Sequence, residues 1–253
     1  MTPQSLNRKS AGDGPAVVLL HPVGLDMTCW HDVAGRLQSR FRVVMLDLRG
    51  HGASPPADAG MTLADYAADV RHTLAAAGID RSAIVGLSFG GMVAQAFALD
   101  YPETVTQLVV AACPSTLPDE ARTALAARGR AGAEHGMASL VEGTLERWFT
   151  PGFIEKGGAL AVRDRLLRTD SGAWDSAWQA ISRIDTRPRL GEIAVPTLCI
   201  AGELDPASPP AALAAIAERV PGARLDVMNG APHMMQIECP AAFADLLDQF
   251  LRR

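Results

Sequence analysis

A serine flanked by two glycines lies where a short apolar run meets a helical pattern. Residues 83–85 are apolar, residues 86–90 read Gly-Leu-Ser-Phe-Gly, and a helix-forming segment starts at Met92. In such a strand-turn-helix the serine takes a strained backbone conformation, and the glycines two positions away let strand and helix approach. The hydroxyl then projects at a helix N-terminus, where developing negative charge is favoured. Ser88 is therefore predicted to be a nucleophile, the alternative being a structural tight turn.

A serine hydroxyl is barely ionised at neutral pH and needs a base, which its place in the chain selects from six histidines. In strand-turn-helix sites of this kind the order along the chain is nucleophile, carboxylate, histidine, so the base follows the last strands. His233 alone meets this condition, in the loop 229–233 after the run 224–228. His233 is the predicted general base.

The carboxylate that orients the histidine is expected in the loop after the preceding strand. The apolar run 197–201 leads into Gly-Glu-Leu-Asp-Pro at residues 202–206. The Gly-x-x-Asp spacing favours Asp205 over Glu203, which is expected to face solvent or to cap the loop. Asp205 would hold the imidazole in one tautomer and stabilise its charged form without taking the proton itself.

An acyl-transfer site also needs donors for an oxyanion, usually two backbone N–H groups. The residue after the nucleophile, Phe89, is expected to supply one. The turn after the first apolar run, residues 21–24, is expected to supply the other through Val23, because Pro22 has no N–H. His21 is expected to stabilise this turn.

Short apolar runs that could position these residues recur between helical patterns. Each run has the length of a buried strand rather than of a helix. Their alternation with helices predicts an α/β fold with a mostly parallel sheet covered by helices on both faces. The runs are 16–20, 42–46, 83–85, 108–112, 197–201 and 225–228.

One long stretch breaks this alternation. Residues 114–190 read as helical without a convincing strand, and Trp30 alone of the four tryptophans lies outside them. We expect a helical cap over 114–190, inserted into an α/β core formed by 1–113 and 191–253. Its aromatic side chains would line a pocket for an organic substrate, or would pack the cap onto the core.

Composition restricts the class of protein. The chain has 253 residues, 48% of them hydrophobic, and a formal net charge of −5. A core of this size can be buried in one domain, and a nucleic-acid partner is not expected without a basic face. No apolar run of about 18 residues and no leader pattern occurs, so neither membrane insertion nor export is expected, and we predict a cytoplasmic protein.

Cofactors and metals are not expected. The four cysteines are widely spaced and are interpreted as reduced thiols, and no histidine cluster has metal-ligand spacing. The glycines in residues 47–54 have the wrong spacing for a dinucleotide cradle, so that segment is interpreted as a tight structural loop. Alanine-rich surface helices are compatible with a homodimer, although nothing in the sequence specifies an interface.

With these motifs in order, the chain resembles the α/β-hydrolase superfamily along essentially its whole length. Within it the chain is most similar to the 3-oxoadipate enol-lactonases, notably in residues 145–151, Leu-Glu-Arg-Trp-Phe-Thr-Pro, and in the segment 185–209. The resemblance implies that Ser88 opens a small carboxylate-bearing lactone through an acyl-enzyme, and that His233 then activates water. It also implies a cationic partner for the substrate carboxylate.

The cap is the more cationic part of the chain, with 11 Lys/Arg against 10 Asp/Glu in residues 114–190. Arg147 and Trp148 are therefore the candidates for substrate binding, the alternative for Arg147 being a solvated helix position. A general carboxylesterase, a carbon–carbon bond hydrolase and a perhydrolase use the same triad and stay open. A non-catalytic ligand receptor is a more remote alternative. Haloalkane dehalogenation is disfavoured, because that chemistry uses a carboxylate where Ser88 stands.

Overall fold

The computed structural model describes residues 1–252, in which seven strands form one sheet in the order β1-β3-β2-β4-β5-β6-β7. All neighbouring strands are parallel except β1, which pairs antiparallel with β3. The strands are β1 (Arg8–Ala11), β2 (Ala16–Leu20), β3 (Arg42–Leu46), β4 (Ser82–Leu87), β5 (Val105–Ala111), β6 (Thr197–Gly202) and β7 (Arg224–Met228).

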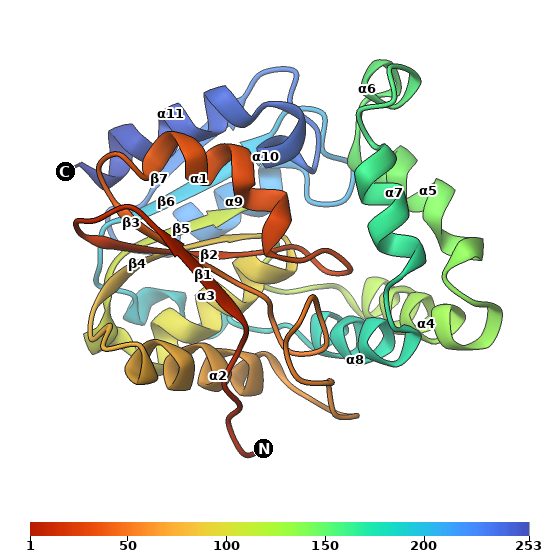
Figure 1. Ribbon diagram of the computed structural model, residues 1–253, viewed down its shortest axis with the longest axis horizontal. Helices are drawn as coiled ribbons and strands as arrows, with labels where there is room; N and C mark the ends of the chain where they lie inside the picture. Colours follow the sequence, from red (N-terminus) through yellow and green to blue (C-terminus); the bar gives the residue numbers. More distant parts are fainter. Residues whose placement is uncertain (253) are drawn as a thin grey trace.

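Helices cover both faces of this sheet (Figure 1). The helices α1 (His31–Leu37) and α11 (Pro240–Leu251) pack together on one face, and α2 (Leu63–Ala76) and α3 (Phe89–Asp100) on the other. The remaining core elements are η1 (Met27–Trp30), η2 (Pro102–Thr104), η3 (Arg187–Glu192), α9 (Pro210–Ala217) and α10 (Met235–Glu238). The predicted α/β architecture is confirmed.

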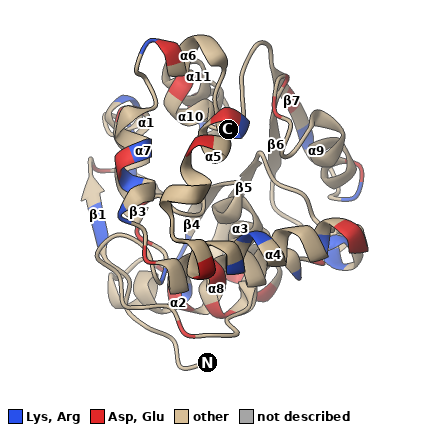
Figure 2. Cartoon of the chain, turned by 90° about the vertical axis from the view of Figure 1, so that its right-hand side faces the viewer, with Lys and Arg blue, Asp and Glu red and all other residues tan. Residues whose placement is uncertain are grey.

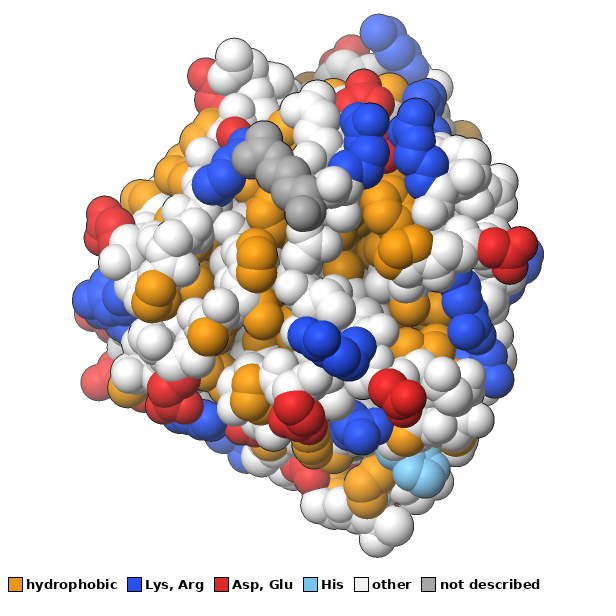
Figure 3. All heavy atoms as spheres, turned by 90° about the vertical axis from the view of Figure 1, so that its left-hand side faces the viewer, with side chains coloured by type: hydrophobic (Ala, Val, Ile, Leu, Met, Phe, Trp, Pro, Cys, Tyr) orange, Lys and Arg blue, Asp and Glu red, His pale blue; other side chains and the backbone are white. Residues whose placement is uncertain are grey.

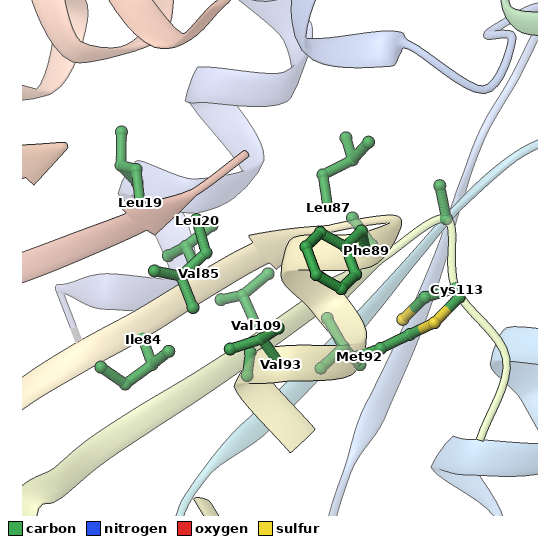
Figure 4. Close-up of a cluster of buried hydrophobic side chains, with 14 of the residues drawn as sticks. Leu19, Leu20, Ile84, Val85, Leu87, Phe89, Met92, Val93, Val109 and Cys113 are labelled. Carbon is green, nitrogen blue, oxygen red and sulfur yellow. The ribbon is translucent and has the colours of Figure 1, made fainter. Parts of the chain in front are cut away.

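The centre of the sheet is apolar on both faces, as expected for parallel strands that lie between helices. Every residue of β4 is buried. Figure 4 shows aliphatic side chains of β2, β4 and β5 packed side by side, with α3 starting directly after the end of β4. This rigid centre carries the loop that contains Ser88.

An insert of helices separates β5 from β6 and lies beyond one end of the sheet (Figures 1 and 2). Its helices α4 and α8 pack against each other, and α5 packs against α7. The insert consists of α4 (Asp119–His135), α5 (Ala138–Trp148), α6 (Pro151–Glu155), α7 (Leu160–Leu167) and α8 (Ser171–Ser182).

The sequence did not predict β1. Its residues are exposed, apart from a half-buried Ala11, so the run has no apolar pattern that would identify it as a strand. The chain before β2 thus adds an antiparallel edge strand to the sheet.

The face opposite the insert carries scattered charges of both signs with small apolar areas between them (Figure 3). No helix within residues 1–252 is both long enough and apolar enough to cross a membrane.

Candidate active site

Ser88 occupies a strained turn between β4 and α3. Its backbone φ of 56° and ψ of −118° lie in a region that side chains rarely adopt. A Cβ on Gly90 would lie 2.1 Å from the Leu20 carbonyl oxygen, and one on Gly86 would lie 2.1 Å from that of Gly90. Only glycine therefore fits at either position, as predicted for this motif. The close approach of β2, β4 and α3 fixes the serine at the end of the sheet.

The three residues selected from the sequence lie together. The Nε2 atom of His233 is 3.0 Å from Oγ of Ser88, and Nδ1 of His233 is 2.7 Å from Oδ2 of Asp205. Because an ionised carboxylate can only accept, Nδ1 carries a proton and donates it to Asp205. Nε2 is then free to accept from the serine hydroxyl. All three side chains are less than a tenth exposed.

The carboxylate of Asp205 is held by more than the histidine. Its Oδ1 atom accepts hydrogen bonds from the backbone N–H groups of Ala207, at 2.8 Å, and Ser208, at 3.0 Å. The neighbouring carboxylate of Glu203 instead accepts from the backbone N–H of Gly230, at 2.7 Å. Glu203 thus connects two loops, in agreement with the expectation that it caps its loop rather than orients the histidine.

The two predicted oxyanion donors are at the same end of the sheet. Phe89 is the first residue of α3, and its N–H has no acceptor among residues 1–252; the same holds for the N–H of Val23. The His21 ring fixes the turn that carries Val23: its Nε2 accepts from the Leu48 N–H at 2.9 Å, so its Nδ1–H donates to the Pro22 carbonyl at 2.7 Å. Both N–H groups are thus available to a ligand.

A cavity of about 240 Å³ opens above Ser88, between the sheet and the insert. The insert contributes most of its walls, through α4, α5 and α8. The cavity is large enough for a compact organic molecule. It is lined by Val23, Ser88, Met92, Pro114, Leu117, Ala124, Leu125, Arg128, Arg147, Trp148, Trp178, Ile181, Ala207, Ser208 and His233.

Trp148 is buried and lies against the histidine, as a pocket residue should. Its ring is stacked on that of His233 with centroids 6.3 Å apart, and its carbonyl accepts from the Met234 N–H at 3.0 Å. Two residues further along, the Thr150 N–H donates to the Glu238 carboxylate at 3.1 Å, and the Thr150 hydroxyl donates at 2.5 Å. The end of α5 is thereby attached to the loop that carries His233.

Two arginines line the cavity, and the sequence identified one of them. Arg147 is exposed at the rim. Arg128 on α4 is half-buried, and burial together with the neighbouring Arg147 lowers the pKa of its guanidinium. Nothing in the sequence singled out Arg128, because its position depends on how α4 packs against α8.

His51 is a buried histidine behind the elbow that the site does not use. Its ring centroid is 6.0 Å from that of Phe89, and its Nδ1 donates to the Arg49 carbonyl at 3.1 Å. Burial and the nearby His21 lower its pKa to about 3. The ring is therefore neutral and packs as part of the core. Residues 1–252 contain no group of three or more His, Cys, Asp or Glu side chains placed to hold a metal ion.

Residues 15–240 match the protein family described as the alpha/beta hydrolase fold. Because this match spans most of the chain, the chain belongs to that family and is a hydrolase of the alpha/beta fold.

Individual relatives match nearly the whole length. The 3-oxoadipate enol-lactonase 2 of Acinetobacter baylyi is 29% identical over 95% of this chain and 90% of its own. A pimeloyl-(acyl-carrier protein) methyl ester esterase of Chromobacterium violaceum is 35% identical over 89% of each chain. The crystal structure of the enol-lactonase from Burkholderia xenovorans superposes with a TM-score of 0.92 at 29% identity, covering 98% of this chain and 96% of the other. The resemblance inferred from the motifs is confirmed.

Proposed function

We propose that the protein is a serine hydrolase that opens a small carboxylate-bearing lactone, similar to 3-oxoadipate enol-lactone, through an acyl-enzyme. The observation that carries the proposal is the chain of hydrogen bonds from Ser88 through His233 to Asp205 at the base of a cavity. The lactonase relatives and the cationic lining of the cavity support the choice of substrate.

In the first step the Ser88 hydroxyl attacks the lactone carbonyl carbon while its proton passes to Nε2 of His233. The carbonyl oxygen becomes an oxyanion, which accepts from the N–H groups of Val23 and Phe89. Asp205 stabilises the imidazolium that forms. When the tetrahedral intermediate collapses, the bond to the ring oxygen breaks and that oxygen takes the proton from His233. The ring is open, and its carbonyl carbon is now an ester of Ser88.

In the second step a water molecule gives a proton to His233 and attacks the ester carbon. The same two N–H groups stabilise the second oxyanion, and its collapse returns the proton to Ser88 and releases a carboxylic acid. An enol freed in the first step becomes a ketone in solution. No cofactor or metal takes part in this sequence.

Residues 114–190 are proposed to act as a cap. Trp148 would confine the substrate next to His233, and Arg147 at the rim would attract its carboxylate. Excluding water around the reacting carbonyl strengthens the hydrogen bonds that stabilise the oxyanion.

The proposal is tested by measuring hydrolysis of small lactones, including 3-oxoadipate enol-lactone, and of short p-nitrophenyl esters. Wild type is expected to open the lactone, and Ser88→Ala is expected to lose at least about 10⁴-fold in kcat/KM. Ser82→Ala is the matched control, since Ser82 is a buried serine at the start of β4, the strand that leads to Ser88, and its hydroxyl has no hydrogen-bond partner among residues 1–252. Lactone opening that survives in Ser88→Ala would refute the role of the serine.

A second candidate is a hydrolase of simple carboxylic esters. The 35% identity to a methyl ester esterase favours it, and the same residues would perform the same two steps on an open-chain ester. Ester cleavage without lactone opening would select this candidate. Inactivity on both substrates would redirect the search to carbon–carbon bond cleavage, perhydrolysis or a receptor role.

The four cysteines carry free thiols, which supports a cytoplasmic location for the enzyme. Burial raises the pKa of the Cys199 thiol to about 12, so this cysteine is an inert core residue rather than a nucleophile.

A further inference from the structure

We propose that the insert completes the oxyanion hole, and that Thr169 is the residue of the insert that positions the turn carrying Val23. The inference rests on the proposed function, in which the Val23 N–H stabilises the oxyanion. Thr169 lies between α7 and α8, and its hydroxyl oxygen is 3.0 Å from the carbonyl oxygen of Gly24, the residue after Val23. A side chain of the insert thus contacts the turn directly beside one of the two proposed donors.

The Thr169 hydroxyl lies near two carbonyl oxygens, those of Gly24 and Arg165. The Gly24 carbonyl accepts no other hydrogen bond among residues 1–252, whereas the Arg165 carbonyl, 3.2 Å from the hydroxyl, already accepts from the Arg168 N–H at 3.1 Å. Gly24 is buried, and a buried carbonyl without a donor is costly. The bond to Gly24 is also the shorter of the two, so the hydroxyl donates to Gly24.

The turn is held from both sides because its own hydrogen bond is weak. The N–H of Leu25 is 3.4 Å from the carbonyl oxygen of Pro22, which is long for a hydrogen bond. On the core side, the ring of His21 donates to that same carbonyl. On the insert side, the threonine hydroxyl donates to the carbonyl of Gly24. The N–H of Val23 lies between these two carbonyls along the chain, so its direction depends on both contacts.

The insert also packs tightly against this turn. Gly24 has a φ of 74°, and a Cβ there would lie 2.8 Å from Cδ2 of Leu166 and 2.8 Å from Cζ3 of Trp174. Both of these side chains are fully buried. Just after the turn, Oδ2 of Asp26 lies 2.6 Å from Nε of Arg165. Packing, a hydrogen bond and an ion pair therefore join residues 24–26 to the insert.

This arrangement gives the insert a part in the chemical step. An oxyanion donor is effective only when it points to the position that the oxygen occupies in the transition state. A small rotation of the turn would leave binding of the substrate intact and would weaken the hydrogen bond that forms in the transition state. Loss of the Thr169 hydroxyl should therefore lower kcat and leave KM nearly unchanged.

The experiment compares Thr169→Val with wild type in the hydrolysis of p-nitrophenyl pentanoate, a neutral ester. The kcat is expected to fall about 10-fold, less than after complete loss of an oxyanion donor, while KM changes by less than about twofold. Both chemical steps form an oxyanion, so this loss is expected whichever step limits the rate. Thr169→Ser keeps the hydroxyl and is expected to recover about half of the wild-type kcat or more.

Thr104→Val is the matched control. Thr104 is also a buried threonine whose hydroxyl donates to a backbone carbonyl, that of Tyr101, but it precedes β5 at the end of the sheet away from Ser88. This variant is expected to keep the wild-type kcat and KM. An unchanged kcat in Thr169→Val, an equal loss in Thr104→Val, or no recovery in Thr169→Ser would overturn the proposal.

A binding measurement separates this inference from the proposed catalytic activity. Butylboronic acid forms a tetrahedral adduct with a nucleophilic serine, and one oxygen of the adduct takes the oxyanion position. Its dissociation constant, measured by calorimetry, is expected to rise about 10-fold in Thr169→Val and to stay unchanged in Thr104→Val. If wild type cleaves neither lactone nor ester but this weakening is observed, the positioning role stands and the hydrolase proposal fails. If butylboronic acid binds wild type and Thr169→Val equally, or binds neither, the positioning role is overturned.

Discussion

The base of the cavity and its walls differ in what holds their functional groups in place. At the base, Ser88 is fixed by backbone geometry: a strained turn, and glycines that allow β2, β4 and α3 to meet. In the walls, Arg128 is fixed by side chains, through two tryptophan rings and one hydroxyl. Backbone geometry of this kind requires particular residues at fixed spacing, so it can be recognised in the sequence. Side-chain packing between α4 and α8 leaves no such motif. The base carries out the chemistry, and the walls are proposed to choose the substrate.

The sharpest test of this division is Asp205→Asn. Losing the carboxylate removes the group that selects the His233 tautomer, so kcat is expected to fall about 10³- to 10⁴-fold while the fold is preserved. The loss should be the same for the anionic ester mono-p-nitrophenyl glutarate and for the neutral ester p-nitrophenyl pentanoate. The residues at the base of the cavity are proposed to interact with the bond that is cleaved and not with charges elsewhere in the substrate. If the loss in kcat differs between the two esters, the base of the cavity and its walls do not act independently.

The next largest effect is expected for Gly90→Ala. The new Cβ would collide with the Leu20 carbonyl at 2.1 Å, and neither backbone can move without distorting the elbow. We expect about 3 kcal/mol or more of lost stability in urea unfolding. In the insert, Gly143→Ala is the matched control: it is an exposed position in α5 with open space around it, and a gain of about 0.5–1 kcal/mol is expected. Equal effects at the two glycines would contradict the difference drawn between the two regions.

A pH dependence of stability is expected from His51, which is buried behind the turn that carries Ser88. The pKa of His51 is about 3 in the folded protein and near 6.5 once unfolded, so between these values the unfolded chain binds more protons. Stability therefore falls as the pH is lowered through this window, by about 2 kcal/mol from pH 8 to pH 5 for this one group.

Urea unfolding of wild type and His51→Gln at several pH values measures this contribution. The variant should lose part of the pH dependence, whatever its stability at pH 8. His72→Gln, at an exposed histidine on α2, is the control. An identical slope in wild type and His51→Gln would show that His51 does not contribute.

The smallest effect is expected for Arg147→Met. Because Arg147 is exposed, its loss should raise KM for mono-p-nitrophenyl glutarate only about threefold and leave kcat unchanged. The effect should decrease as salt is added, because ions screen an exposed charge. A loss of more than about tenfold would mean that Arg147 contributes more than an exposed charge is expected to.

Most of the sheet was predictable because burial of parallel strands leaves short apolar runs. The expected runs 16–20 and 42–46 coincide with β2 and β3, and the others differ from their strands by a few residues at the ends. The strand β1 was missed for the complementary reason: as an exposed edge strand it has polar residues and no apolar run. Its pairing with β3 depends on tertiary contact that no local pattern reveals.

The functional site also contains residues that the sequence could predict and residues that it could not. Ser88, Asp205 and His233 could be located because each follows a strand in a fixed order, and the structure brings them within hydrogen-bonding distance. Arg128 could not be located, because a lone arginine on a polar helix resembles any solvated position. Its environment arises only when Gly129 and Gly132 let α8 approach α4.

The attachment of α5 to the histidine loop joins the insert to the catalytic residues. Trp148 and Thr150 are hydrogen-bonded to Met234 and Glu238, so this end of the insert is tied to the segment that follows His233. A substrate that enters without moving this joint leaves the hydrogen bond between His233 and Ser88 intact. The position of the catalytic base therefore depends on the insert as well as on the sheet.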